Sequence, residues 1–141
     1  MHPHDLIRKN LELVATRAPD LTARFYDRLF ERHPELRGMF GRRSAEAQQR
    51  MLLEAIVAVV DHLEDAAWLG ETLGALGAKH VDYGVRDEMY PLVGSALVAT
   101  LADVSGDEWD AETEAAWTAA LTFVAETMIA GAESARRVAA E

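Results

Sequence analysis

The chain has 141 residues, half of them hydrophobic, which is enough for one domain (residues 1–141) with a substantial core. The absence of cysteine excludes disulfides, thiolate metal sites, iron–sulfur clusters and a cysteine nucleophile. With 24 acidic and 14 basic residues, the net charge of −10 disfavours nucleic-acid and anionic membrane partners.

The first ten residues hold no apolar segment of the kind that a signal peptide needs. No uninterrupted apolar run is long enough to span a bilayer. We therefore expect a cytoplasmic protein with no membrane partner.

Two helices are predicted at the start of the chain, over residues 5–17 and from residue 21 to the His33-Pro34 break. Asp20 is a suitable cap for the second helix. Tyr26 lies beside its inward face, either as a core aromatic with its hydroxyl at the boundary or as a buried hydroxyl for a polar ligand. The other inward residues are Leu6, Leu11 and Val14, then Leu21, Phe25, Leu29 and Phe30.

Two large apolar residues, Met39 and Phe40, stand between Gly38 and Gly41 after a short turn that begins at Pro34. Exposing such a pair to water would be costly. Phe40 therefore either fills the core or packs on a flat apolar ligand.

A third helix is predicted after Ser44, which is a suitable cap. Gln48 lies one turn before Leu52 and so continues the apolar stripe of this helix. Exposure at the helix end or a backbone hydrogen bond would explain the glutamine without a ligand. The stripe is Leu52, Ile56, Val59 and Leu63.

The helix that begins near Asp65 ends with a histidine on its apolar face. Leu69, Leu73 and Leu76 are four and three residues apart, and His80 follows on the same face. A buried neutral imidazole needs a partner for its ring nitrogens, which could be a backbone carbonyl, a hydroxyl or a metal. Taken alone, His80 is most simply a satisfied core residue.

Three glycines, Gly70, Gly74 and Gly77, lie in the same helix, although each costs about 1 kcal/mol of helix stability relative to alanine. Their spacing would let the helix lie close to a flat group or to another backbone. A turn is expected over 81–85, followed by a helix that starts within 87–91 and points Tyr90 inward.

The remaining helices have regular apolar stripes and no strand-like alternation is present, so we predict an all-α fold. The helix of Tyr90 continues inward through Val93, Leu97 and Leu101 and breaks at 105–107. The last helix starts near residue 107 or 110, and its inward residues are Trp117, Leu121, Val124 and Met128.

Four polar residues, Tyr26, Gln48, His80 and Tyr90, are thus expected to point inward, which is more than a plain apolar core tolerates. Four segments carry a resemblance to a known family: Leu-Thr-Ala-Arg-Phe-Tyr-Asp-Arg-Leu-Phe at 21–30, Pro-Glu-Leu-Arg-Gly-Met-Phe at 34–40, Ala-Lys-His at 78–80, and Tyr-Pro-Leu-Val-Gly at 90–94, extended by Ala-Thr-Leu at 99–101. In these segments the chain resembles the globins, and specifically the haem domain of bacterial flavohaemoglobins and single-domain bacterial haemoglobins.

The resemblance implies haem b as cofactor and a role for each matching residue. His80 corresponds to the proximal histidine that binds the haem iron, and Tyr90 to the proximal tyrosine that contacts it. Tyr26 and Gln48 correspond to the distal tyrosine and glutamine, which with Tyr90 form the expected catalytic set. The expected haem contacts also include Phe40, Leu52 and Val85, and Lys79 at a haem propionate or a reductase surface.

The chain departs from the family pattern in three places. The loop between Phe40 and Gln48 is shorter than usual, and because the sequence ends at residue 141, we expect the reductase to be a separate protein. A family glutamate that bonds to the proximal tyrosine is replaced by Ser134, with Glu133 adjacent, when the last helix is aligned without gaps. Because a carboxylate there strengthens the histidine as a donor, its loss is expected to weaken peroxidase-like O–O cleavage.

Three functions remain open at this point. The first is a haem enzyme that binds O2, NO and CO and converts NO to nitrate with a separate flavin- and NAD(P)H-dependent reductase. The second is a globin for O2 storage, delivery or sensing without turnover. The third is a haem-free helical interaction module, against which the combination of inward residues argues. A monomer or a homodimer is expected in each case.

Overall fold

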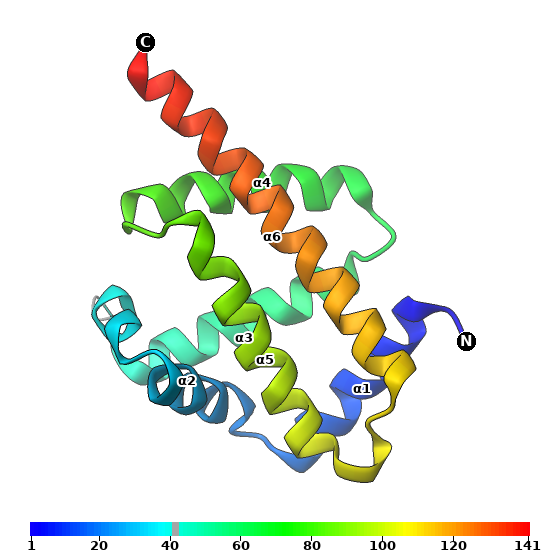
Figure 1. The fold of residues 1–141 in the computed structure, drawn as a ribbon. Coiled ribbons are helices and arrows are strands. Elements are labelled where there is room, and N and C mark those ends of the chain that lie inside the picture. The colour runs from blue at the N-terminus through cyan, green and yellow to red at the C-terminus, as the bar shows by residue number, and fades with distance from the viewer. Residues whose placement is uncertain (41–42) are drawn as a thin grey trace.

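The computed structural model describes residues 1–40 and 43–141, so Gly41 of the predicted glycine-flanked pair lies outside the described residues. Every regular element in these two ranges is a helix, which confirms the all-α prediction (Figure 1). In chain order the elements are α1 (Pro3–Arg17), α2 (Leu21–Arg32), η1 (Pro34–Phe40), α3 (Ala45–Asp61), α4 (Ala66–Asp82), η2 (Asp87–Met89), α5 (Tyr90–Ser105), η3 (Gly106–Glu108) and α6 (Ala111–Ala140).

Two groups of crossing helices make up the molecule. Helix α6 crosses α4 and continues past it to the C-terminus, while its first half packs on α1 and α5 (Figure 1). Helix α2 packs on α5, on η1 and on α3. The histidine-bearing α4 is therefore held mainly by α6.

The buried residues form two clusters. The larger one joins α1, α2, α5 and α6 around Phe25, Leu29, Leu101 and Trp117, and each such side chain contributes about 1.5–3 kcal/mol when fully buried. The smaller one joins α4 to α6 through Leu69, Leu73 and Met128, with Leu76 and Tyr90 packed against it. The predicted inward faces of α2, α5 and α6 supply most of these residues.

The inward face of α1 differs from the prediction. Ile7, Asn10 and Val14 are buried, whereas Leu6 and Leu11 are only half-buried. Asn10 is a polar residue on this apolar face, and hydrogen bonds compensate for its burial. Its amide donates to the Ser105 hydroxyl at 2.8 Å, and its carbonyl oxygen accepts from the Trp117 indole at 3.0 Å. This network ties α1 to α5 and α6.

Several helix ends also differ from the prediction. Helix α1 begins at Pro3, because proline is suited to a first turn and the His2 side chain accepts a bond from the His4 amide. Helix α4 runs to Asp82, and the turn falls at Gly84, whose φ of 82° favours glycine. The predicted Ser44 cap is confirmed, since its hydroxyl accepts from the Ala47 amide.

Two segments, Asp87–Glu108 and Ala111–Ala140, are long and apolar enough to cross a membrane by length and composition alone. They contain α5 and α6, which bury Leu97, Leu101 and Trp117 in the core. The core helices of globular proteins pass the same test. In this structure 33% of the most apolar window of the first segment and 22% of that of the second are buried.

Replacing Asn10 by leucine should lower the free energy of unfolding by about 2–4 kcal/mol, because the Trp117 indole and the Ser105 hydroxyl would stay buried without partners. Urea unfolding of the variant and the wild type measures the difference. Lys9→Leu, at an exposed neighbouring position, is the control and should change stability by less than about 0.5 kcal/mol. An unchanged midpoint for Asn10→Leu would show that the network contributes nothing.

Candidate cofactor site

His80 lies one turn from the end of α4 with its ring half-buried. Its Nδ1 is 2.7 Å from the Leu76 carbonyl oxygen, which can only accept, so Nδ1 donates this bond and carries the proton. Burial lowers the pKa of His80, with the Leu76 carbonyl acting in the opposite direction. The neutral ring therefore keeps its Nε2 lone pair free for a metal.

Tyr90, at the start of α5, places its ring centroid 6.3 Å from that of His80. Its hydroxyl is buried and has no hydrogen-bond partner among the described residues. Burial raises the pKa of Tyr90, and the nearby Asp87 carboxylate raises it further, so the hydroxyl stays protonated. A buried hydroxyl without a hydrogen bond costs about 1–3 kcal/mol of folding free energy. This cost indicates that the Tyr90 hydroxyl faces a binding site for a group other than the described residues.

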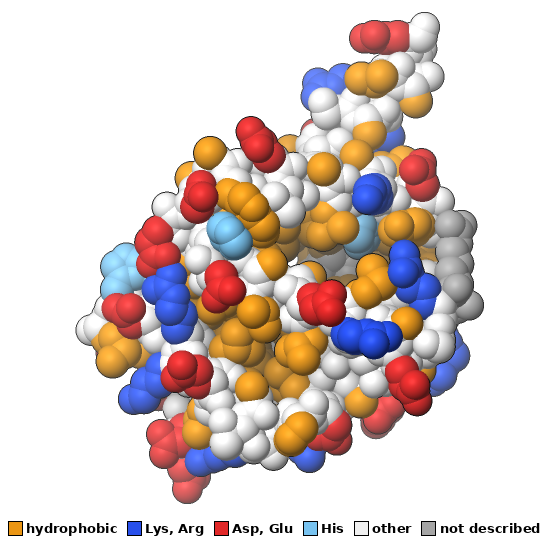
Figure 2. All heavy atoms as spheres, turned by 180° about the vertical axis from the view of Figure 1, so that it is seen from behind, with side chains coloured by type: hydrophobic (Ala, Val, Ile, Leu, Met, Phe, Trp, Pro, Cys, Tyr) orange, Lys and Arg blue, Asp and Glu red, His pale blue; other side chains and the backbone are white. Residues whose placement is uncertain are grey.

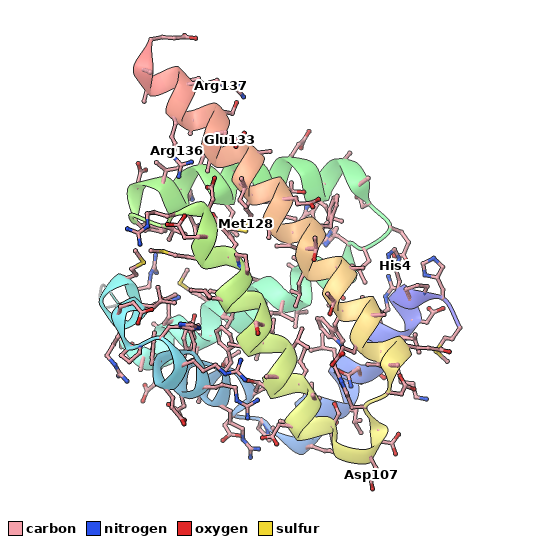
Figure 3. The ribbon with its side chains drawn as sticks, in the orientation of Figure 1. His4, Asp107, Met128, Glu133, Arg136 and Arg137 are labelled. Carbon is pink, nitrogen blue, oxygen red and sulfur yellow. The ribbon has the colours of Figure 1, made fainter. Side chains whose placement is uncertain are left out.

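Neither Glu133 nor Ser134 completes a proximal network. Both are exposed on α6, and the Tyr90 hydroxyl bonds to no described residue. The charged residue that α6 directs toward the start of α5 is Arg136, which pairs with Asp87 at 3.4 Å (Figure 3). Within the part of the chain that the structure describes, no carboxylate bonds to the Tyr90 hydroxyl.

On the other side of the site, Tyr26 and Gln48 are joined by a hydrogen bond. The Gln48 amide Nε2 donates to the Tyr26 hydroxyl at 3.1 Å. The glutamine is half-buried, and this side-chain partner replaces both simple explanations considered for it, helix-end exposure and a backbone bond. Because the hydroxyl accepts this bond, its own proton remains available for another acceptor.

Three aromatic rings surround Tyr26. The centroids of Phe25, Phe40 and Phe30 lie 5.0, 5.4 and 5.8 Å from its own. Burial in this cluster raises the pKa of Tyr26, and the bond from Gln48 offsets only part of that effect. The hydroxyl is thus held as a neutral donor at physiological pH.

The other predicted site residues occupy three settings. Phe40 ends η1 and is half-buried, with its ring against Tyr26 and Phe30. Leu52 and Val85 are half-buried at the edge of the larger cluster, and the Val85 amide donates to the His80 carbonyl oxygen at 3.1 Å. Lys79 is exposed. Its contact with a propionate or a reductase stays a prediction.

The predicted inward stripe of α3 is only half-buried. Leu52, Ile56, Val59 and Leu63 all retain partial exposure, and Val60 is the buried residue of this helix. Figure 2 shows a hollow in the molecular surface with hydrophobic side chains on its walls and a histidine at its edge. Apolar side chains in such number indicate a large apolar ligand.

The donor set narrows the class of ligand. No group of three or more His, Cys, Asp or Glu that could hold a metal ion occurs in the described parts of the chain. One imidazole nitrogen cannot bind a free metal ion tightly, so the metal must bring its other ligands in a flat organic group. Haem fits this description, and His80, the Tyr90 hydroxyl and the half-exposed apolar side chains fit haem.

Sequence reasoning gave a backbone carbonyl as one of three possible partners of His80 without identifying Leu76, and it missed a second contact of this site. The Leu76 carbonyl as partner of His80 could have been anticipated, because a helical side chain lies over the turn that precedes it. The Asp87–Arg136 pair joins segments 49 residues apart, and nothing in the local sequence indicates it.

Comparison with known proteins agrees with this geometry. The family model described as Globin matches residues 23–128. A flavohemoprotein of Rhodopirellula baltica is 36% identical over 88% of this chain and 31% of its own length, so the chain spans about a third of such curated relatives.

Two solved structures share the fold. An engineered carbene transferase, made from a candidate nitric oxide dioxygenase of Rhodothermus marinus, superposes with a TM-score of 0.85 at 25% identity over 99% of this chain and 96% of its own. The flavohemoglobin of Malassezia yamatoensis, solved with bound FAD and haem, superposes with a TM-score of 0.72 at 23% identity over 94% of this chain and 36% of its own.

Replacing His80 by glycine should abolish haem retention, because the donor set offers no second axial nitrogen at this position. Added imidazole should restore a haem absorption band, since it supplies the missing nitrogen to an otherwise unchanged pocket. His62→Gly is the control and should retain haem. The His62 ring bonds to the Ala58 carbonyl and stacks on Trp68, and it is not a predicted iron ligand. Haem retention by His80→Gly without imidazole would remove His80 from its role.

Proposed function

Because the chain belongs to the globin family, we propose that it binds haem b through His80 and uses it to oxidise nitric oxide to nitrate with O2. The observation that carries the proposal is the bond from Gln48 to the Tyr26 hydroxyl. It fixes a neutral hydroxyl whose proton is free to be donated. The flavohemoprotein relatives and the Rhodothermus marinus neighbour support the choice of reaction.

Haem, when bound, supplies an iron that takes up O2 and NO and changes between ferrous and ferric states. The reaction NO + O2 + e⁻ gives nitrate, so each turnover needs one electron. We propose that a flavin- and NAD(P)H-dependent reductase in the cytoplasm delivers it. Lys79, exposed beside His80, would lie at the edge where such a partner approaches.

The chain's own residues divide the work between the two sides of the pocket. His80 binds the iron through Nε2, and the Leu76 carbonyl keeps its ring in one orientation. The Tyr26 hydroxyl would donate a hydrogen bond to a polar ligand on its side of the haem, and Gln48 holds the phenol oxygen in place. The apolar residues, including Phe40, Leu52 and Val85, exclude water, which strengthens this hydrogen bond.

A second function, reversible O2 storage or delivery, is favoured by a specific observation. The Tyr90 hydroxyl has no carboxylate partner among the described residues, so the imidazole is a donor of ordinary strength. That arrangement suits stable O2 binding better than O–O cleavage. Turnover decides between the two functions.

The turnover experiment supplies the haem-loaded protein with O2, repeated NO additions, NAD(P)H and a flavin reductase, and measures nitrate. Dioxygenation predicts many equivalents of nitrate per protein. Consumption that stops after one equivalent, with every reductase offered, would contradict the enzyme and leave the storage function.

Tyr26→Phe should speed O2 dissociation roughly 10- to 100-fold, because it removes a hydrogen bond to a partly charged ligand. CO is less polar, so its dissociation should change much less and serves as the internal control. Stopped-flow mixing of the O2 form with CO measures the rate. An unchanged O2 dissociation rate would remove Tyr26 from the donor role.

A further inference from the structure

The close crossing of α4 and α6 is made by backbone atoms. A Cβ built on Gly77 would lie 2.0 Å from the Met128 carbonyl oxygen, and one built on Gly131 would lie 2.1 Å from the Gly74 carbonyl oxygen. Real side-chain carbons do not approach so closely, so each position requires glycine. Figures 1 and 3 show α6 crossing α4 at this level, with Met128 beside the crossing.

This crossing lies directly behind the histidine. Gly77 follows Leu76, whose carbonyl accepts the bond from His80 Nδ1, and it precedes His80 by less than one turn. Leu76 and Tyr90 also pack against the Leu69, Leu73 and Met128 cluster that fills the α4–α6 contact. A displacement of α4 at Gly77 would therefore move both the acceptor of His80 and the ring itself.

The other two glycines of α4 have free space where a side chain would begin. A Cβ on Gly70 or on Gly74 would meet nothing within 4 Å. Glycine lowers helix stability by a similar amount at all three positions. Helix propensity therefore cannot account for the difference in space around their Cβ positions. The close approach, and not general weakness of the helix, distinguishes Gly77.

We propose that Gly77 and Gly131 are positioning residues for His80, because their close backbone contacts with Met128 and Gly74 set the distance between α4 and α6 and hence the position of the His80 ring. The inference rests on the proposed haem ligation by His80. It gives a role to the glycines at the α4–α6 crossing. The inward side chains that would contact haem do not explain these glycines.

Alanine at Gly77 must push the two backbones apart by at least about 1 Å to reach an ordinary carbon–oxygen separation. The bond from His80 to the iron would then be lengthened or tilted, and its stretching frequency in the ferrous, ligand-free protein would fall. Gly131→Ala makes the same kind of clash one turn away from Gly77, so the frequency should fall by a smaller amount.

The test is resonance Raman spectroscopy of the ferrous haem-loaded protein, with Gly70→Ala and Gly74→Ala as matched controls on the same helix. The proposal predicts a lower iron–histidine frequency for Gly77→Ala and Gly131→Ala, outside the range of wild type and both controls. If either test variant fails to fold, it is placed on the Gly70→Ala/Gly74→Ala background, where added helix propensity raises stability.

A wild-type frequency in folded, haem-loaded Gly77→Ala and Gly131→Ala, accompanied only by a lower melting temperature, would overturn the proposal and leave a structural role. A wild-type protein that takes up no haem, or a His80→Gly variant that retains haem as the wild type does, would instead overturn the haem ligation itself. The two failures are therefore distinguishable.

Discussion

The hydrogen bond from His80 Nδ1 to the Leu76 carbonyl is the interaction on which the site depends. It places the proton on Nδ1, and burial disfavours a second proton, so Nε2 is left with a free electron pair. A helix supplies this bond without any added residue, because the acceptor lies one turn back. The position of α4 in the fold depends on other elements. Here the close backbone contacts with α6 fix it.

The two sides of the pocket differ in how their tyrosine hydroxyls are hydrogen-bonded. On the Tyr26 side, three aromatic rings surround the phenol and Gln48 donates to its oxygen, which leaves the hydroxyl proton free. The Tyr90 side has a buried hydroxyl without a hydrogen-bond partner among the described residues, and the nearby charges of Asp87 and Arg136 are paired with each other. His80 is thus oriented by a backbone carbonyl, whereas the Tyr26 hydroxyl is oriented by the Gln48 side chain.

The sequence predicted the helices and the inward polar residues because both follow from the 3.6-residue period. Tyr26 and Gln48 were identified on their faces, but their mutual bond depends on how α2 and α3 cross, which no local pattern specifies. The inward face of α1 was misassigned for a related reason: Asn10 looks like a surface residue until Trp117 and Ser105 meet it. The Gly77 contact required the backbone of α6, 51 residues along the chain at Met128.

The most direct test of histidine-bound haem in an open pocket is the absorption spectrum of the protein, first reduced and then reduced under CO. A five-coordinate ferrous spectrum whose Soret band sharpens and shifts on CO addition is the predicted result. A protein that shows no Soret band even after haem is added would contradict haem binding. A six-coordinate ferrous spectrum that CO leaves unchanged would contradict the open ligand side.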